Sequence, residues 1–370
     1  MSASGAKTEL EELLAQLVAI PSPSGEEQAI ADFCAAWLAE RGLEVRRVER
    51  SVVARLPGEG PRLLLNSHLD TVPAGEGWEE DPWRAEWQGG RLVGLGANDA
   101  KGCVAAMMTA AAELASGSAL EGELVLALVH EEETTNKGMA AVLAELGAPE
   151  LAVTGEPTGL EVVRAQAGLA VLEARWRGRS CHAAHVARVA HDNALLAASR
   201  ELAALPEVHL LEGAHELLGP STLTPTVLRA GERNNCVPDL ARATFDARLA
   251  APHDAEECLA VLRRHLPTAE LEVRSKRLAA VETPADHPLV RLAVARAKKP
   301  AAVGSSTLSD MALLPGVPAV KCGPGETVRS HTANEYVTRA ELAAGARFYA
   351  HLAPEVLAVV ARGAAQETTP

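Results

Sequence analysis

One stretch constrains the fold of this chain more than any other: the apolar run Leu63-Leu-Leu-Asn-Ser-His68-Leu-Asp70, which ends in a histidine and an aspartate. The run predicts a buried strand, and ligand sites in open α/β sheets gather at the carboxyl ends of strands. His68 could bind a metal ion through one ring nitrogen while Asp70 fixes the orientation of the ring. A plain turn after a strand explains the same two residues, so the pair alone decides nothing.

Further carboxylates and a histidine follow the later predicted strands: Asp99, Glu132 with Glu133, Glu156 and His331. Asp99 precedes an Ala-rich helix predicted over 104–114, where it could serve only as a helix cap. The glutamates follow the apolar strand 123–129. A solvated acidic turn would account for them, whereas a bound dication would relieve their mutual repulsion.

Composition narrows the class of protein. Of the 370 residues, 48% are hydrophobic and 23% charged, as in ordinary globular proteins, and the length allows two domains. The net charge of −14 argues against a nucleic-acid partner, which would require a basic face. The chain contains no apolar run long enough to span a bilayer and no secretory signal at its N-terminus. Its six cysteines form no Cys-x-x-Cys pair, which suits reduced thiols, and we expect a cytoplasmic protein with no membrane partner.

The patterning predicts an α/β fold in which one unit is inserted into another. Before residue 164 and after residue 284, apolar strands alternate with amphipathic helices, among them a helix that begins at Ser24. Residues 165–283 instead predict the order β-α-β-β-α-β, with strands at 169–177, 241–249 and 271–278 and helices at 192–205 and 254–266. This order is typical of a small ferredoxin-like α+β layer. We therefore expect a mixed-sheet catalytic domain over 1–164 and 284–370, interrupted by a second domain over 165–283.

The candidate ligands define a chemistry. Imidazole and carboxylate ligands without cysteine suit zinc, cobalt or manganese. Five ligands exceed what one catalytic zinc ion requires, but they suit two ions that share a carboxylate. A remaining glutamate could then act as general base for amide hydrolysis by metal-activated water.

Five segments together resemble the dinuclear-zinc aminoacylase and carboxypeptidase family. They occur in the family's order over nearly the whole chain: Ser67-His68-Leu-Asp70-Thr-Val-Pro73, Gly96-Ala-Asn-Asp99-Ala-Lys101-Gly102, Glu132-Glu133-Thr134, Gly155-Glu156-Pro157-Thr158 and Cys322-Gly323-Pro324-Gly325-Glu326 with His331-Thr332. The resemblance implies a homodimer in which the inserted domain provides the dimer contact, and two zinc or cobalt ions per chain.

The resemblance also implies a role for each site residue. Asp99 would bridge the two ions. His68 and Glu156 would complete one metal site, and Glu133 and His331 the other. The catalytic residues would be the general base Glu132, the orienting carboxylate Asp70, and His182, which would stabilise the oxyanion in the partner subunit's site. A surface histidine is the alternative for His182.

The three consecutive glutamates leave the register open. Counting back from Gly138, which matches a family glycine, selects Glu132 as base and Glu133 as ligand. A shift by one residue would give these roles to Glu131 and Glu132.

The substrate follows only from the resemblance. Asn235, Arg248 and Gly323 would bind substrate, with Arg248 gripping a carboxylate unless it is an ordinary strand arginine. Residues 304–311 look most like the acetylornithine deacetylase branch, and Asp310 could either sense a distal cation or cap a helix. We expect an enzyme of arginine biosynthesis that removes acetyl from N-acetylornithine. Alternatives are a succinyl-diaminopimelate desuccinylase, a carboxypeptidase or dipeptidase of the same family, and a metal-free binding or scaffold protein.

Overall fold

The computed structural model describes residues 8–206, 211–250 and 252–367, which form two compact units. The first comprises the segments Met1–Arg164, Glu282–Val303 and Ser309–Pro370, and the second Ala165–Val281 with Gly304–Leu308. The sequence assigns 304–308 to the catalytic part, but this segment clusters with the inserted one. Gly304 packs so closely on Leu217 that a Cβ there would lie 2.6 Å from the Leu217 carbonyl oxygen.

The first unit is built on a large mixed sheet with the strand order β1-β2-β6-β3-β7-β15-β8-β13. Strands β6, β3, β7 and β15 are mutually parallel, whereas β1 and β2 form an antiparallel hairpin beside β6. The strands in this order are β1 (Glu44–Val48), β2 (Ser51–Leu56), β3 (Arg62–His68), β6 (Glu123–Val129), β7 (Leu151–Thr154), β8 (Val163–Gln166), β13 (Val281–Glu282) and β15 (Ala319–Lys321). A further strand, β14 (Val303–Ser305), pairs with β8 outside the order. A small separate sheet contains β4 (Trp87–Gln88), β5 (Arg91–Val93) and β16 (Tyr336–Thr338).

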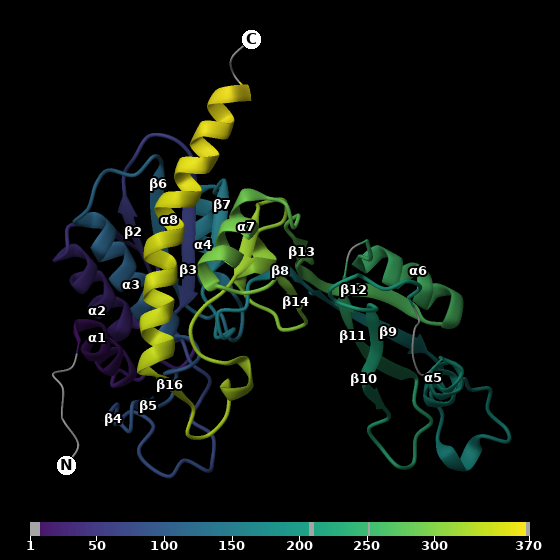
Figure 1. Ribbon diagram of the computed structural model, residues 1–370. Coiled ribbons are helices and arrows are strands. Elements are labelled where there is room, and N and C mark those ends of the chain that lie inside the picture. The colour runs from purple at the N-terminus through teal and green to yellow at the C-terminus, as the bar shows by residue number, and fades with distance from the viewer. Residues whose placement is uncertain (1–7, 207–210, 251, 368–370) are drawn as a thin grey trace. The chain divides into compact units, whose positions relative to one another are not determined.

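Helices cover the large sheet and complete its core. They are α1 (Glu9–Val18), α2 (Gln28–Ala39), α3 (Lys101–Ala115), α4 (Lys137–Leu146), α7 (Pro288–Ala297) and α8 (Arg339–Glu367). The Ala-rich α3 is buried over most of its length because small side chains let it pack closely against its neighbours. The long α8 runs beside α3 and contacts β3 (Figure 1). None of the described helices is long and apolar enough to cross a membrane.

The second unit has its own core and a four-stranded antiparallel sheet ordered β10-β11-β9-β12. Its elements follow one another as β9 (Gly168–Arg177), α5 (Ala194–Ala203), β10 (Thr222–Ala230), β11 (Leu240–Leu249), α6 (Ala255–His265) and β12 (Glu270–Leu278). This is the predicted β-α-β-β-α-β order. The predicted fold class, a mixed-sheet α/β unit interrupted by an α+β unit, is confirmed.

The start of α2 differs from the prediction. The helix begins at Gln28 rather than near Ser24. The hydroxyl of Ser24 donates instead to the Asp70 carboxylate at 2.6 Å, so it is not free to cap a helix.

Candidate metal centre

The parallel strands bring the predicted ligands to one edge of the large sheet. In the strand register His68 pairs with Val129, and Asn66 pairs with Thr154, so that β3, β6 and β7 end nearly level. His68 is the last residue of β3, and the glutamates 131–133 and Glu156 follow β6 and β7. This alignment explains why residues distant in the sequence converge.

Asp99 lies between the two histidines of the group. The Nε2 of His68 is 3.1 Å from Asp99 Oδ1 and 4.0 Å from Glu156 Oε2. On the other side, His331 Nε2 is 2.9 Å from Glu133 Oε1 and 3.8 Å from Asp99 Oδ2. Each oxygen of Asp99 thus faces a different histidine, as a carboxylate shared by two ions requires.

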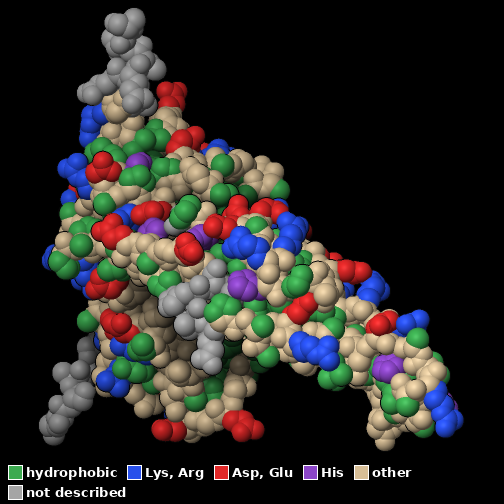
Figure 2. Space-filling model, turned by 90° about the vertical axis from the view of Figure 1, so that its right-hand side faces the viewer, with side chains coloured by type: hydrophobic (Ala, Val, Ile, Leu, Met, Phe, Trp, Pro, Cys, Tyr) green, Lys and Arg blue, Asp and Glu red, His purple; other side chains and the backbone are tan. Residues whose placement is uncertain are grey.

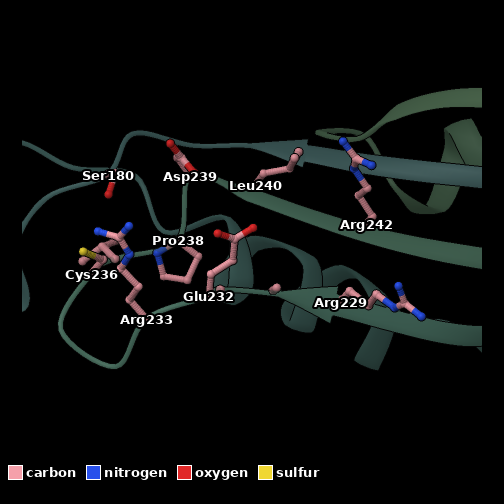
Figure 3. Close-up of a pocket in the computed structure, with 12 residues that line it drawn as sticks. Ser180, Arg229, Glu232, Arg233, Cys236, Pro238, Asp239, Leu240 and Arg242 are labelled. Atoms are coloured by element: carbon pink, nitrogen blue, oxygen red, sulfur yellow. The ribbon is translucent and has the colours of Figure 1, made fainter.

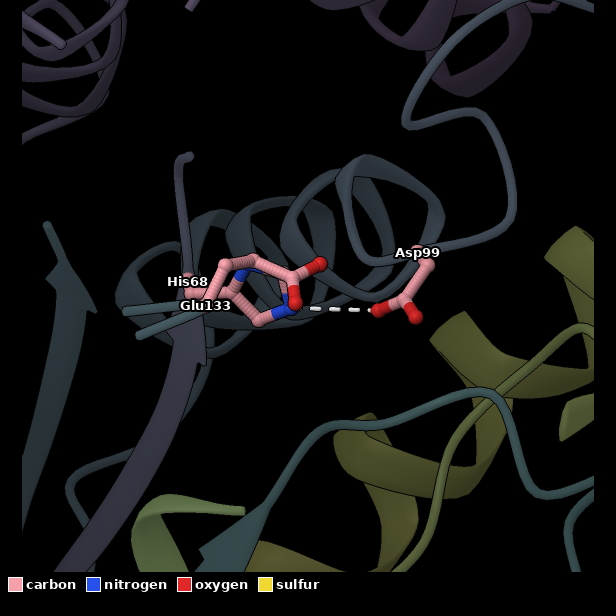
Figure 4. A group of neighbouring side chains, drawn as sticks. All are labelled: His68, Asp99 and Glu133. Carbon is pink, nitrogen blue, oxygen red and sulfur yellow. Dashed lines mark hydrogen bonds and ion pairs between the residues drawn. The ribbon is translucent and has the colours of Figure 1, made fainter. Parts of the chain in front are cut away.

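His68, Asp99 and Glu133 have donor atoms that all lie within 4.8 Å of one another (Figure 4). Asp99 does not cap α3, because the residue before that helix is Ala100 and no side chain caps its first turn. The alternative of a simple helix cap is therefore wrong for Asp99.

The carboxylates near this group repel one another. Burial raises the pKa of Glu156 to about 8, with Asp99 and Glu133 adding to the effect against the opposing charge of His68. Burial likewise raises the pKa of Glu132 well above its usual range, and the charge of Glu156 adds to the shift. The hydrogen bond to Glu133 raises the pKa of His331 to about 9. Two imidazoles among several carboxylates are a donor set that fits divalent ions.

The three consecutive glutamates point in different directions. Glu131 forms an ion pair with Arg50 and accepts a hydrogen bond of 2.7 Å from the Thr135 hydroxyl. Glu133 faces His331, and Glu132 is enclosed near Glu156. The geometry therefore favours the register in which Glu132 and Glu133, and not Glu131, belong to the site.

Asp70 organises the turn that carries these glutamates. Its carboxylate accepts hydrogen bonds from the backbone N–H groups of Glu132 and Glu133 at 3.0 and 3.1 Å. The Nδ1 of His68 lies 3.5 Å from the Asp70 carboxylate but 2.9 Å from the Asp70 backbone oxygen. The ring is thus held mainly by the backbone of Asp70, while its carboxylate fixes the position of the turn.

The second unit holds the segments of His182 and Asn235 beside a pocket. The N–H of Ala183 donates to the carbonyl oxygen of Asn235 at 2.9 Å, which places the His182 segment beside the Asn235 segment. A pocket of about 610 Å³ opens next to them, with Arg229 on β10, Arg242 on β11, and Glu232 and Arg233 on the intervening loop (Figure 3). Both basic and acidic side chains line this pocket.

Arg248 and Gly323 differ in their surroundings. Arg248 is exposed on β11 and pairs with Asp246 at 2.8 Å. Gly323 is buried in the first unit, where a Cβ would lie 2.6 Å from Cys103 Sγ and 2.7 Å from the Glu156 backbone oxygen. Gly323 thus allows close packing behind Glu156.

Sequence reasoning missed Asn98. Its side chain donates to the Glu326 carbonyl oxygen at 3.1 Å and accepts from the Glu326 N–H at 2.9 Å. These bonds tie the Asp99 turn to the loop that leads to His331. Its place in the Gly96-Ala-Asn-Asp99 motif was the only available signal.

Comparison with known proteins identifies the family. The model of peptidase family M20/M25/M40 matches residues 64–355, most of the chain. The chain belongs to this family. M20 members hydrolyse peptide or amide bonds, and this chain shares that general activity.

Among curated M20 relatives, an acetylornithine deacetylase from Myxococcus xanthus is 30% identical over 88% of this chain and 91% of its own length. A succinyl-diaminopimelate desuccinylase from Wolinella succinogenes is 32% identical over 66% of this chain and 70% of its length. A [LysW]-lysine hydrolase from Deinococcus radiodurans is 30% identical over 89% of this chain and 92% of its own length. Three different amide substrates thus occur among relatives of similar identity.

Solved structures share the M20 fold. Aminopeptidase PepT from Bacillus cereus superposes with a TM-score of 0.77 at 21% identity, covering 94% of this chain and 98% of that one. The YXEP protein from Bacillus subtilis is described as a dinuclear metal-binding peptidase of family M20. It superposes with a TM-score of 0.72 at 18% identity, and the match covers 94% of this chain and 98% of the YXEP chain.

Proposed function

We propose that this M20 protein is a metal-dependent deacetylase that acts on the α-amide of an N-acetylated amino acid, with N-acetylornithine as the first candidate. The observation that carries the proposal is the convergence of four potential ligands, His68, Glu133, Glu156 and His331, on a fifth, Asp99, with Glu132 beside them as a further, half-buried carboxylate. His68 and Glu156 would hold one divalent ion and Glu133 and His331 the other, with Asp99 shared. Zinc or cobalt would suit these imidazole and carboxylate donors.

Bound ions would polarise the scissile carbonyl group and lower the pKa of water. The chain's own contribution is proton transfer. Glu132 would accept a proton from the attacking water as its oxygen bonds to the carbonyl carbon, and would then donate that proton to the amine nitrogen as the C–N bond breaks. Asp70 would hold Glu132 in place through the backbone bond described above. The products are acetate and the free amino acid.

We also propose a homodimer formed through the second unit. Strand β10 lies at the sheet edge, and its Val227 and Leu228 are 42% and 49% exposed. An edge strand with exposed apolar side chains is a ready surface for pairing with a second chain. In such a dimer His182 would stabilise the oxyanion in the partner's site, and Asn235 and Arg248 would contact substrate.

One observation favours a second candidate. The succinyl-diaminopimelate desuccinylase from Wolinella succinogenes matches this chain as well as the deacetylase does, at 32% against 30% identity, although over a shorter stretch. Unlike a deacetylase, a desuccinylase would need space and a cationic side chain in its substrate site for the second carboxylate of the succinyl group.

A substrate panel tests the proposal. Purified protein with added Zn²⁺ or Co²⁺ is assayed on N-acetylornithine, N-acetylcitrulline, N-succinyl-diaminopimelate and simple dipeptides. We expect the highest kcat/KM on an N-acetyl amino acid. A highest value on the succinyl substrate would select the second candidate, and one on dipeptides would select a peptidase.

The cytoplasmic location stays a prediction from the sequence.

On the face seen in Figure 2, Lys and Arg side chains are interspersed with Asp and Glu side chains.

A further inference from the structure

Asp310 is a buried acid that the proposed reaction does not use. Asp310 is 1% exposed, so its carboxylate does not lie on the surface that a substrate in solution meets first. It caps no helix either, because the residue whose side chain caps the short 3₁₀ helix Asp310–Leu313 is Ser309. Neither role expected from the sequence therefore fits.

Both oxygens of Asp310 accept hydrogen bonds from buried amides. Asn66 Nδ2 donates to Oδ2 at 3.1 Å, and Asn136 Nδ2 donates to Oδ1 at 3.1 Å. Asn66 is in turn held by the Thr154 hydroxyl, which donates to its amide oxygen at 2.8 Å. Asp310 thus joins the end of β3 to the turn between β6 and α4.

Asn136 connects this cluster to the candidate general base. An amide nitrogen carries two hydrogens, and the Asn136 Nδ2 that bonds Asp310 also lies 3.5 Å from Glu132 Oε1. Asn136 has φ 53°, a left-handed conformation that asparagine tolerates better than most residues. The amide nitrogen of Asn136 therefore lies between the carboxylates of Asp310 and Glu132.

We propose that Asp310 is a positioning residue for the hydrolytic reaction. It orients the Asn136 amide, which holds one carboxylate oxygen of Glu132 in place and leaves the other oxygen free to accept the proton of water. This inference rests on the proposed function, in which Glu132 is the base. A neutral amide suits the task, because it can hold a carboxylate without pairing with it as a cation would.

The experiment uses the full-length protein loaded with Zn²⁺ and the variants Asn136→Gly, Asp310→Ala and their combination. Glycine accepts the positive φ of residue 136, so Asn136→Gly removes the side chain without backbone strain. The measurements are kcat, KM, bound zinc and Tm, on whichever amide of the panel the wild type hydrolyses fastest. Thr283→Val serves as control. Thr283 is 1% exposed. Its hydroxyl donates to the carbonyl oxygen of Ala319 at 2.6 Å and accepts from the Ala319 N–H at 2.8 Å.

We expect each single variant to lower kcat about 10- to 100-fold, with KM within about threefold and zinc retained. The double variant should be no slower than the slower single variant, because both residues act along one path. Thr283→Val should lower Tm but leave kcat within about twofold.

The inference is overturned if Asn136→Gly retains wild-type kcat, or if the fold-loss in kcat of the double variant equals the product of the two single losses. It is also overturned if Thr283→Val lowers kcat as much as the single variants do. Where Asp310→Ala does not fold, a wild-type kcat in Asn136→Gly still overturns the inference. A wild type that hydrolyses no amide of the panel contradicts the proposed function instead, and this inference with it.

Discussion

His331 and Glu133 are 198 residues apart in the sequence, yet His331 Nε2 lies 2.9 Å from Glu133 Oε1. His331 is also the exposed member of the group, with 52% of its side chain accessible against 1% for His68. The site is therefore open to solvent on the His331 side and closed on the His68 side. A substrate would reach it from the His331 side.

The pH dependence of stability should differ between metal-free and metal-loaded protein. The folded, metal-free protein holds extra protons, because the pKa of Glu156 is raised to about 8 by burial and that of His331 to about 9 by Glu133. The unfolded chain releases these protons at lower pH. Stability without metal should therefore fall as the pH rises from about 5 to about 9.

Ions bound at the proposed sites would hold Glu156 and His331 deprotonated, so the metal-loaded protein should not lose stability over this range. Calorimetric Tm values at pH 6 and pH 9, with chelator and with Zn²⁺, check both statements. A metal-free Tm that rises with pH would contradict the raised pKa values of Glu156 and His331.

Glu132→Gln should reduce kcat by about 10²- to 10⁴-fold, because the amide cannot accept the proton of water. Bound metal should be unchanged. Glu131→Gln is the matched control, since Glu131 pairs with Arg50 outside the site, and it should retain kcat within about threefold. The reverse ranking of the two variants in a kinetic assay would mean that the register is shifted by one residue.

Asp70→Ala should both destabilise the fold and impair the site. The substitution leaves the partly buried N–H groups of Glu132 and Glu133 without this acceptor, and a fully buried donor in that state would cost about 1–3 kcal/mol. We expect a lower urea midpoint and at least about a 10-fold loss of kcat. Ser24→Ala removes only a donor to Asp70 and should have a smaller effect on both. Equal effects of the two variants would show that the backbone contacts are unimportant.

Leu228→Lys should dissociate the proposed dimer by placing a charge on the exposed edge strand β10. Light scattering after size-exclusion chromatography would report the mass. Val328→Lys, at a residue that is 85% exposed in the first unit, is the control and should keep the dimer mass. A wild-type monomer, or an unchanged mass for Leu228→Lys, would rule out this interface.

The sequence predicts the sheet edge because the strands leading to it are apolar runs. Buried parallel strands read as continuous hydrophobic stretches, so the positions of His68, Glu133 and Glu156 at strand ends could be predicted without coordinates. Their convergence then follows from parallel pairing in register.

Other features depend on contacts that no local pattern reveals. Strand β10 contains Pro225 and a register shift between Pro225 and Val227, and among the described strands it lies at the edge of its sheet, so its alternation is weak. Ser24 has the sequence pattern of a helix cap, yet it bonds to Asp70, 46 residues away. The link from Asp310 to Asn136 joins residues 174 apart.

Metal analysis of active protein tests the central claim most directly. Elemental analysis and activity are measured on the same wild-type and Asp99→Ala samples after removal of free metal. We predict two divalent ions per active wild-type chain, and fewer than one, with activity lost, for Asp99→Ala, because both proposed sites share that carboxylate. Full activity in wild-type protein without divalent ions would contradict the claim.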